Sequence, residues 1–142
     1  MNTAYRNDFY GWTQEQAALL RAGRLDRLDI EHLIEELESM GARERRELGN
    51  RLAVLLMHLL KWQFQPERRG RSWSLTIKIQ RLDIRALLKQ NPGIGPDIPE
   101  ILADAYAKAR LLAARQTGLD EAAFPEQCGW PIESVLSDEF LP

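Results

Sequence analysis

The chain has 142 residues, of which 44% are hydrophobic and 28% charged, and its formal net charge is −2. This size and composition are typical of one globular domain and exclude a disordered or fibrous protein. No window approaches the ~18 consecutive apolar residues of a membrane span, and the N-terminus lacks the pattern of a secretory signal. We therefore expect a single domain over residues 1–142 that is cytoplasmic and has no membrane partner.

The first predicted helix covers residues 13–22. Thr13 and Gln16 have the spacing of a capping box, in which two side chains satisfy free backbone N–H groups, and Gly23 provides a stop. The residues ahead of this helix are too aromatic for a free tail. We expect them to pack onto the body of the protein: Tyr5, Phe9, Tyr10 and Trp12.

The second predicted helix begins with Asp29 as its N-cap. Its apolar residues recur at spacings of three and four, which predicts one buried stripe: Ile30, Leu33, Ile34, Leu37 and Met40. Gly41 is expected to end or kink this helix. A third helix then runs from about residue 43 to residue 64 and stops before Pro66.

Residues 73–80 alternate between apolar and polar, which is the period of a strand. A lone strand cannot satisfy its backbone groups, and the sequence offers no second strand, so we predict a fourth helix from Ser72 to Lys89. This helix has two apolar faces, and we expect it to be sandwiched between two neighbours. One face holds Trp73, Ile77, Ile84 and Leu88, and the other holds Leu75, Ile79, Leu82 and Ala86.

Residues 91–96, with the sequence NPGIGP, break the helical pattern. Asp97 and Glu100 have the spacing of a cap for the last long helix, which Gly118 ends. Pro125 and Pro131 break the remainder into short turns of helix at most. The predicted fold class is all-α. We expect an up-and-down helical bundle of four to five helices, with the third helix central and a proline-broken C-terminal tail.

Charge is segregated along the chain. Of the 19 Lys and Arg residues, 12 lie between Arg43 and Lys89, together with only four of the 21 acids. Several of these basic residues recur at spacings of three and four on the fourth helix and form one ridge. We interpret the ridge as the surface of a non-enzymatic binding module for an anionic partner, either nucleic acid or an acidic protein. The candidate binding residues are Arg68, Arg69, Arg71, Trp73, Lys78, Arg81, Arg85 and Lys89. The alternative is that the ridge lies beside the acidic second helix and the two neutralise each other.

Two histidines suggest a different chemistry. His32 shares a helix face with Glu35 and Glu36, and His58 interrupts the apolar run of the third helix. If these four residues meet, they would hold a divalent metal for a metal-assisted hydrolase. The simpler interpretation of His58 is a hydrogen-bonded histidine at the edge of the core. No other cofactor and no catalytic nucleophile is evident. A third interpretation is a homodimer that uses apolar faces assigned above to the core.

Three stretches of the sequence resemble the bacterial domain of unknown function 29 family. They are DFYGWTQEQAALLRAGRLDRLDIEHLIEELESMG, HLLKWQFQPERRGRSWSLTI, and the ending from TGLDEAAFPEQC to DEFLP. The resemblance covers nearly the whole chain. It implies an all-helical, single-domain bacterial protein with no assigned activity, cofactor, partner or catalytic residues, and it supports a helix over residues 72–89. Asparagine is usual in the family where this chain has His32, which weakens the metal hypothesis.

Overall fold

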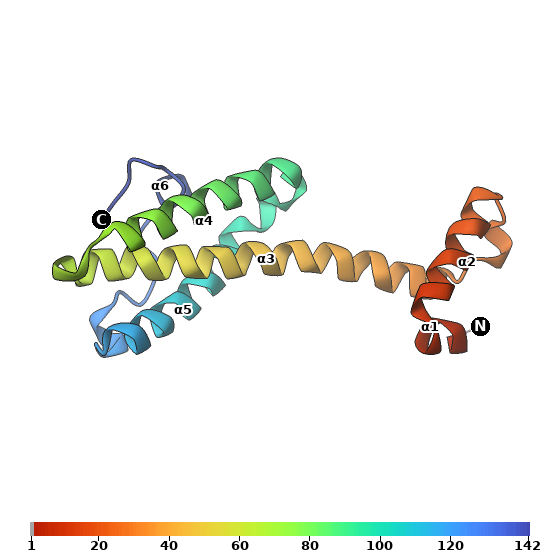
Figure 1. Cartoon of the computed structure of the whole chain (residues 1–142), viewed down its shortest axis with the longest axis horizontal. Coiled ribbons are helices and arrows are strands. Elements are labelled where there is room, and N and C mark those ends of the chain that lie inside the picture. The colour runs from red at the N-terminus through yellow and green to blue at the C-terminus, as the bar shows by residue number, and fades with distance from the viewer. Residues whose placement is uncertain (1) are drawn as a thin grey trace. The chain divides into compact units, whose positions relative to one another are not determined.

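The computed structural model describes residues 2–142, with side chains from Ala4 onward. This range contains six α-helices and no strand, and four of the helices have 13 or more residues (Figure 1). The predicted all-α class is confirmed, and the number of helices fits the expected four to five. None of the helices in this range is both long enough and apolar enough to cross a membrane.

The chain divides into two compact units, Met1–Arg43 and Glu44–Pro142. The expectation of one domain over residues 1–142 stays a prediction.

The first unit contains α1 (Asn2–Asn7), α2 (Phe9–Arg21), the 3₁₀ turn η1 (Leu25–Arg27) and the beginning of α3 (Ile30–Phe64). The Asp8 carboxylate caps α2 by accepting a hydrogen bond from the Gly11 backbone at 3.0 Å. The predicted capping box at Thr13 and Gln16 is therefore wrong, because the helix begins at Phe9 and Thr13 lies inside it. The Gln16 side chain instead accepts a hydrogen bond from the Asp29 backbone N–H at 2.8 Å.

The N-terminal aromatic residues pack within the first unit. The Tyr5 ring lies 4.7 Å from the Trp12 ring and 4.0 Å from the His32 ring, measured between centroids. The Tyr5 hydroxyl donates a hydrogen bond to Glu36, which raises the pKa of Tyr5 to about 12. Tyr10 is the exception, since it is 73% exposed. Phe9 contacts the Tyr5 and Trp12 rings but is also 49% exposed. The expected packing of this segment is therefore observed for Tyr5 and Trp12, and it takes place within the first unit.

α3 is one continuous helix of 35 residues. The prediction that Gly41 ends a second helix and that a third begins near residue 43 is therefore wrong. A glycine in a helix interior costs only about 1 kcal/mol relative to alanine and, unlike proline, keeps its backbone N–H. Gly41 does not adopt a left-handed backbone angle, and Glu38, Ala42 and Glu44 around it are good helix formers. The neighbours thus override the break that the glycine suggests.

The second unit is built around the part of α3 that follows residue 43. The core residues of this part include six leucines with 0% exposure: Leu48, Leu52, Leu55, Leu56, Leu59 and Leu60. The turn η2 (Pro66–Arg68) leads to α4 (Arg71–Gln90), and η3 (Pro92–Asp97) leads to α5 (Ile98–Thr117). Both helices run alongside this part of α3 and share its hydrophobic core (Figure 1). The predicted central helix and the predicted helix over residues 72–89 are therefore present.

After α5 the chain forms only short turns, η4 (Glu121–Ala123) and α6 (Ile132–Val135). Irregular backbone leaves carbonyl oxygens without helical partners, and long side chains of the helices donate to several of them. From α5, the Tyr106 hydroxyl donates to the Pro125 carbonyl at 2.6 Å, and Arg110 donates to the Phe124 carbonyl at 3.2 Å. The C-terminal tail is therefore broken as predicted, and side chains of the helices fasten it.

Candidate interaction surface

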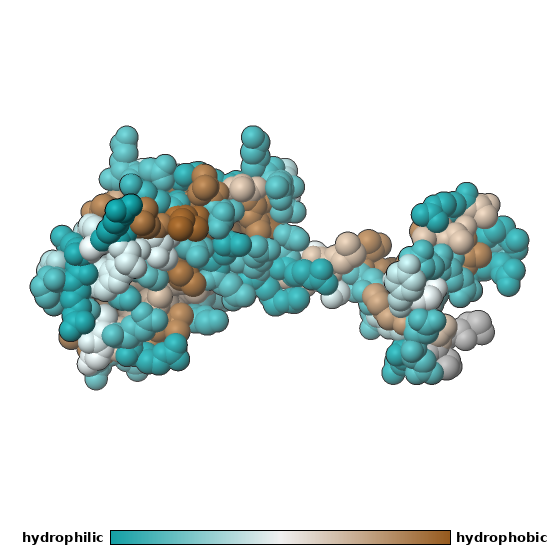
Figure 2. Space-filling model, viewed as in Figure 1, coloured by the Kyte–Doolittle hydropathy of each residue, from teal (hydrophilic) through white to brown (hydrophobic). Residues whose placement is uncertain are grey.

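α4 has two apolar faces, of which only one is buried. Ile77, Ile84 and Leu87 are at most 8% exposed and belong to the core of the second unit. The opposite face, which we call the outer face of α4, consists of Leu75, Ile79, Leu82 and Ala86. Its first three residues are 43%, 54% and 63% exposed, in that order. Figure 2 shows hydrophobic side chains at the surface over α4. The prediction that α4 is sandwiched between two neighbours is therefore wrong. α4 packs against the core of the second unit with one face only, so its second apolar face stays outside.

Three basic residues border the outer face. Arg71, Lys78 and Lys89 are exposed, and each lies three or four positions from a member of the outer face. None of the three forms an ion pair with any side chain of residues 4–142. The only acid of α4, Asp83, pairs with Arg51 at 3.0 Å. The outer face is thus an apolar stripe with an unpaired positive edge.

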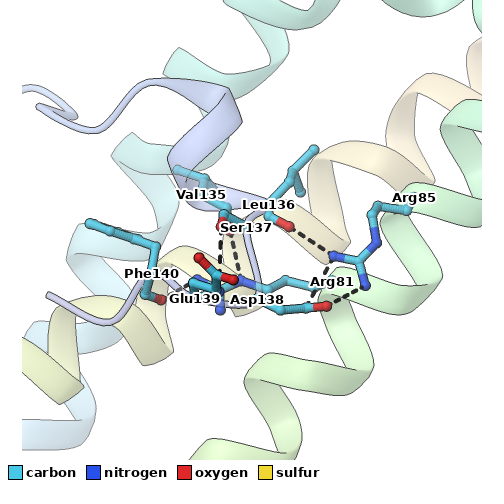
Figure 3. A network of polar contacts seen from close by, with 8 residues as sticks. All are labelled: Arg81, Arg85, Val135, Leu136, Ser137, Asp138, Glu139 and Phe140. Carbon is cyan, nitrogen blue, oxygen red and sulfur yellow. Dashed lines mark hydrogen bonds and ion pairs between the residues drawn. The ribbon is translucent and has the colours of Figure 1, made fainter.

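Arg81 does not belong to this open surface. It is 1% exposed, and Figure 3 shows its side chain directed at the C-terminal tail. Its Nε donates to the Val135 carbonyl at 2.9 Å, and its Nη2 donates to the Phe140 carbonyl at 2.7 Å. Burial lowers the pKa of the Arg81 guanidinium from its usual value. Arg81 therefore holds the tail and is inaccessible to a partner.

Arg85 fastens the same tail one helical turn later (Figure 3). Its Nη1 donates to the Leu136 carbonyl at 2.8 Å, and its two terminal nitrogens contact the two Asp138 carboxylate oxygens at 3.1 and 3.2 Å. Such a two-pronged contact matches the geometry of the guanidinium fork. Two of the predicted binding residues, Arg81 and Arg85, are thus engaged within the second unit.

The arginine-rich turn before α4 is only partly free. Arg69 Nε donates to the Trp62 carbonyl at 2.7 Å, and its guanidinium carbon lies 5.3 Å from the centre of the Trp62 ring. The Trp73 ring lies 4.6 Å from Lys61 Nζ. Both tryptophans therefore already face a cation of their own unit, whereas Arg68 is exposed.

A second apolar stripe is exposed in the first unit. The prediction that this stripe is buried is wrong for four of its members, which are 56%, 49%, 66% and 55% exposed: Ile30, Ile34, Leu37 and Met40. Within this unit the aromatic rings of α1 and α2 pack on the side of α3 that carries His32 and leave the apolar side open.

The segment from residue 28 to residue 42 contains five acids and no Lys or Arg. Of these acids, Glu31 and Glu38 lie three and four positions from Ile34. We call the four apolar residues and these two glutamates the acidic stripe.

Two of the candidate metal ligands lie in a hydrogen-bond network of the first unit. One Asp29 carboxylate oxygen accepts from Trp12 Nε1 at 3.0 Å and from His32 Nδ1 at 2.8 Å, and His32 Nε2 lies 3.8 Å from Glu35. Desolvation acts to raise the pKa of the Asp29 carboxyl, but the hydrogen bonds from His32 and Trp12 outweigh it, and the net shift is downward. The network joins the aromatic cluster to the start of α3.

The other two candidate ligands, Glu36 in the first unit and His58 in the second, have hydrogen-bond partners of their own. Glu36 accepts the hydrogen bond of the Tyr5 hydroxyl, and His58 lies in the second unit, where its Nδ1 donates to the Val54 carbonyl at 2.9 Å. Burial lowers the pKa of His58. Among the side chains of residues 4–142, no group of three or more His, Cys, Asp or Glu residues is arranged to hold a metal ion.

The geometry therefore defines an all-helical protein that exposes two amphipathic helix faces of opposite charge. The chain belongs to the family described as Domain of unknown function DUF29, whose model matches residues 4–141. The resemblance seen in the sequence is thereby confirmed. No curated protein and no solved structure matches the chain.

The sequence interpretation missed the fastening of the tail. Backbone carbonyls such as those of Val135 and Phe140 accept hydrogen bonds without any side-chain signal in the sequence. One signal was available on the donor side, because Arg81 lies four positions after Ile77 and three before Ile84, in the middle of the buried face. A cation at such a position needs internal acceptors.

Proposed function

We propose that this chain is a non-enzymatic interaction module that binds an acidic, amphipathic helix of a protein partner on the outer face of α4. The proposal is carried by one observation, the exposed apolar stripe with an unpaired positive edge. A partner helix with an apolar stripe would cover Leu75, Ile79 and Leu82, as in other helix-in-groove contacts. Acidic residues beside that stripe would face the basic edge of α4.

The chemistry of the outer face favours a protein over a nucleic acid. Interfaces for nucleic acid are strongly positive throughout, because they neutralise many phosphates. The centre of the outer face is apolar, and two arginines of the predicted ridge, Arg81 and Arg85, bind the tail. The remaining positive charge lies along one edge, which suits an acidic helix.

We also propose that the protein resides in the bacterial cytoplasm. The chain has one cysteine, Cys128, which is half-buried, and burial raises the pKa of its thiol. A thiol in this state is a poor nucleophile, and a chain without disulfides suits a reducing compartment.

The test is fluorescence anisotropy of a labelled helical peptide that carries leucines at spacings of three and four, bordered by glutamates, titrated with the full chain. We expect saturable binding that Leu82→Glu weakens at least about 10-fold, which corresponds to about 1.4 kcal/mol. The matched control is Leu111→Glu on α5, because Leu111 is also an exposed leucine, at 57%. This variant should bind as the unmodified chain does.

A DNA duplex in the same assay decides between the two kinds of partner. Absence of peptide binding would overturn the proposal. So would tight DNA binding that survives Leu82→Glu and is lost in Lys78→Ala, since that pattern would assign the basic edge to phosphate contacts.

A further inference from the structure

The chain itself contains a helix face with the chemistry that the outer face of α4 would take. We propose that the acidic stripe of one copy of the chain binds the outer face of α4 of a second copy. This inference rests on the proposed function, because it uses the same surface of α4 and names the partner as another copy.

The two faces match in length and in apolar character. Four apolar residues span from Leu75 to Ala86 on α4, and four span from Ile30 to Met40 in the acidic stripe. At a rise of 1.5 Å per residue these stretches are about 16 Å and about 15 Å long, or roughly three helical turns each. Both have their large side chains exposed, so contact between them would remove leucine and isoleucine surface from water on both sides.

The two faces are opposite in charge. The segment of the acidic stripe has five acids and no Lys or Arg, whereas α4 has a single acid, Asp83, which Arg51 already engages. Two of the five Lys and Arg residues of α4, Arg81 and Arg85, bind the tail, and the other three remain on the open surface. Glu31 and Glu38 border the first face, and Arg71, Lys78 and Lys89 border the second. Opposite charges along two packed helices fix which faces pair and in which register.

Pairing of like faces is disfavoured by the same charges. Two outer faces in contact would bring the Lys78 side chains of both copies close together, and like charges repel each other. Two acidic stripes in contact would bring the Glu38 side chains together, with the same repulsion. The surface therefore favours a contact between unlike faces of two copies over a contact between identical faces.

The experiment measures the mass of the full chain by light scattering over a series of concentrations. The chain has a mass of 16.4 kDa, and we expect a larger value that falls toward 16.4 kDa on dilution. Leu82→Glu, which spoils the outer face, and Leu37→Lys, which spoils the acidic stripe, should each stay at the monomer mass when alone. Leu111→Glu is the control and should associate as the unmodified chain does.

Mixing the two variants identifies the faces that meet. The Leu82→Glu chain keeps an intact acidic stripe, and the Leu37→Lys chain keeps an intact outer face, so an equimolar mixture should regain a mass above that of the monomer. Association of the Leu82→Glu chain alone would overturn the proposal in favour of paired acidic stripes. Association of the Leu37→Lys chain alone would overturn it in favour of paired outer faces. A mixture that stays monomeric would overturn it as well.

Circular dichroism of each variant checks that its helical content is unchanged. If either variant loses helix, the surface charge swaps Lys78→Glu and Glu38→Lys replace it in the same mixing scheme, with the same expected and contradicting results. A chain that stays at 16.4 kDa but binds the acidic peptide in a Leu82-dependent way overturns self-association and leaves the proposed function in place. A chain that neither associates nor binds the peptide overturns both.

Discussion

At the scale of single residues, α4 carries two kinds of arginine and lysine. Arg81 and Arg85 are directed at backbone carbonyls of the tail, whereas Lys78 and Lys89 remain in solvent. A guanidinium fork can serve two carbonyls at once, and a buried cation is tolerated only when acceptors surround it. The spacing of the ridge in the sequence could not separate these roles, because it does not show where the tail returns.

Replacing Arg81 by alanine should destabilise the protein. The change removes two charge-assisted hydrogen bonds, to the Val135 and Phe140 carbonyls, from a buried site. We expect the free energy of unfolding in urea to fall by about 3 kcal/mol. Lys78→Ala is the control at an exposed position and should change it by less than about 0.5 kcal/mol. An Arg81→Ala protein as stable as the Lys78→Ala protein would contradict the role of Arg81 in holding the tail.

His58 should make stability depend on pH. Burial lowers its pKa in the folded chain below the ordinary 6.5, so between these two values the unfolded chain binds more protons than the folded one. The contribution of neutral His58 to the free energy of unfolding is therefore fully present above pH 6.5, and it declines as the pH falls from 6.5 toward the folded-state pKa. The His58→Gln variant cannot titrate at this position, and its free energy of unfolding should fall less between about pH 7.5 and about pH 5. Equal losses in the two proteins would contradict a lowered pKa of His58 in the folded chain.

At the scale of elements, the helical character of most of the chain follows from the sequence, but the continuity of α3 and the packing partners of the helices do not. Residues 73–80 fit the period of a strand, and the prediction of a helix over residues 72–89 rests on the absence of a second strand in the sequence, with the 3.6-residue period then used to assign its faces. The same period correctly found two apolar faces on α4 and one on the start of α3. It could not show that Leu75, Ile79 and Leu82 lack a neighbour, because burial depends on how many helices surround each face.

The continuity of α3 leads to a prediction at Gly41. This glycine is helical, and a Cβ added to it would meet no atom within 4 Å. Gly41→Ala should therefore stabilise the protein by about 0.5–1 kcal/mol and slow hydrogen exchange of the amides around it. Gly118→Ala is the matched control, because Gly118 has a φ of 77° and alanine there is strained. It should destabilise the protein by about 1 kcal/mol. Destabilisation by Gly41→Ala would mean that the helix breaks or bends at this glycine.

At the scale of the whole molecule, charge segregation along the sequence proved to be the most informative signal. The negatively charged segment before residue 43 contains the acidic stripe, and the positively charged segment that follows it contains the outer face of α4. Internal neutralisation accounts for part of the positive segment, through the Arg85–Asp138 and Arg51–Asp83 pairs. Those partners could not be found from the sequence, because they lie 53 and 32 residues away from the arginines they meet.

Salt should weaken the self-association if opposite charges contribute to it. The Debye length falls from about 10 Å at 0.1 M salt to about 3 Å at 1 M, so exposed ion pairs between copies would be screened. We expect the dissociation constant from light scattering to rise several-fold over this range. Lys78→Glu combined with Glu38→Lys in one chain should show the same salt dependence, because the charges are exchanged and not removed. Association that is unchanged or stronger at high salt would contradict the contribution of charge.

The most direct test of the docking surface is a nuclear magnetic resonance titration of the ¹⁵N-labelled full chain with the acidic amphipathic peptide. We predict that the amide shifts concentrate on residues 71–89. A second set on residues 30–40 should appear as the peptide displaces the acidic stripe of another copy. Shifts concentrated on α5, or no shifts at saturating peptide, would contradict the claim that the outer face of α4 binds an acidic helix.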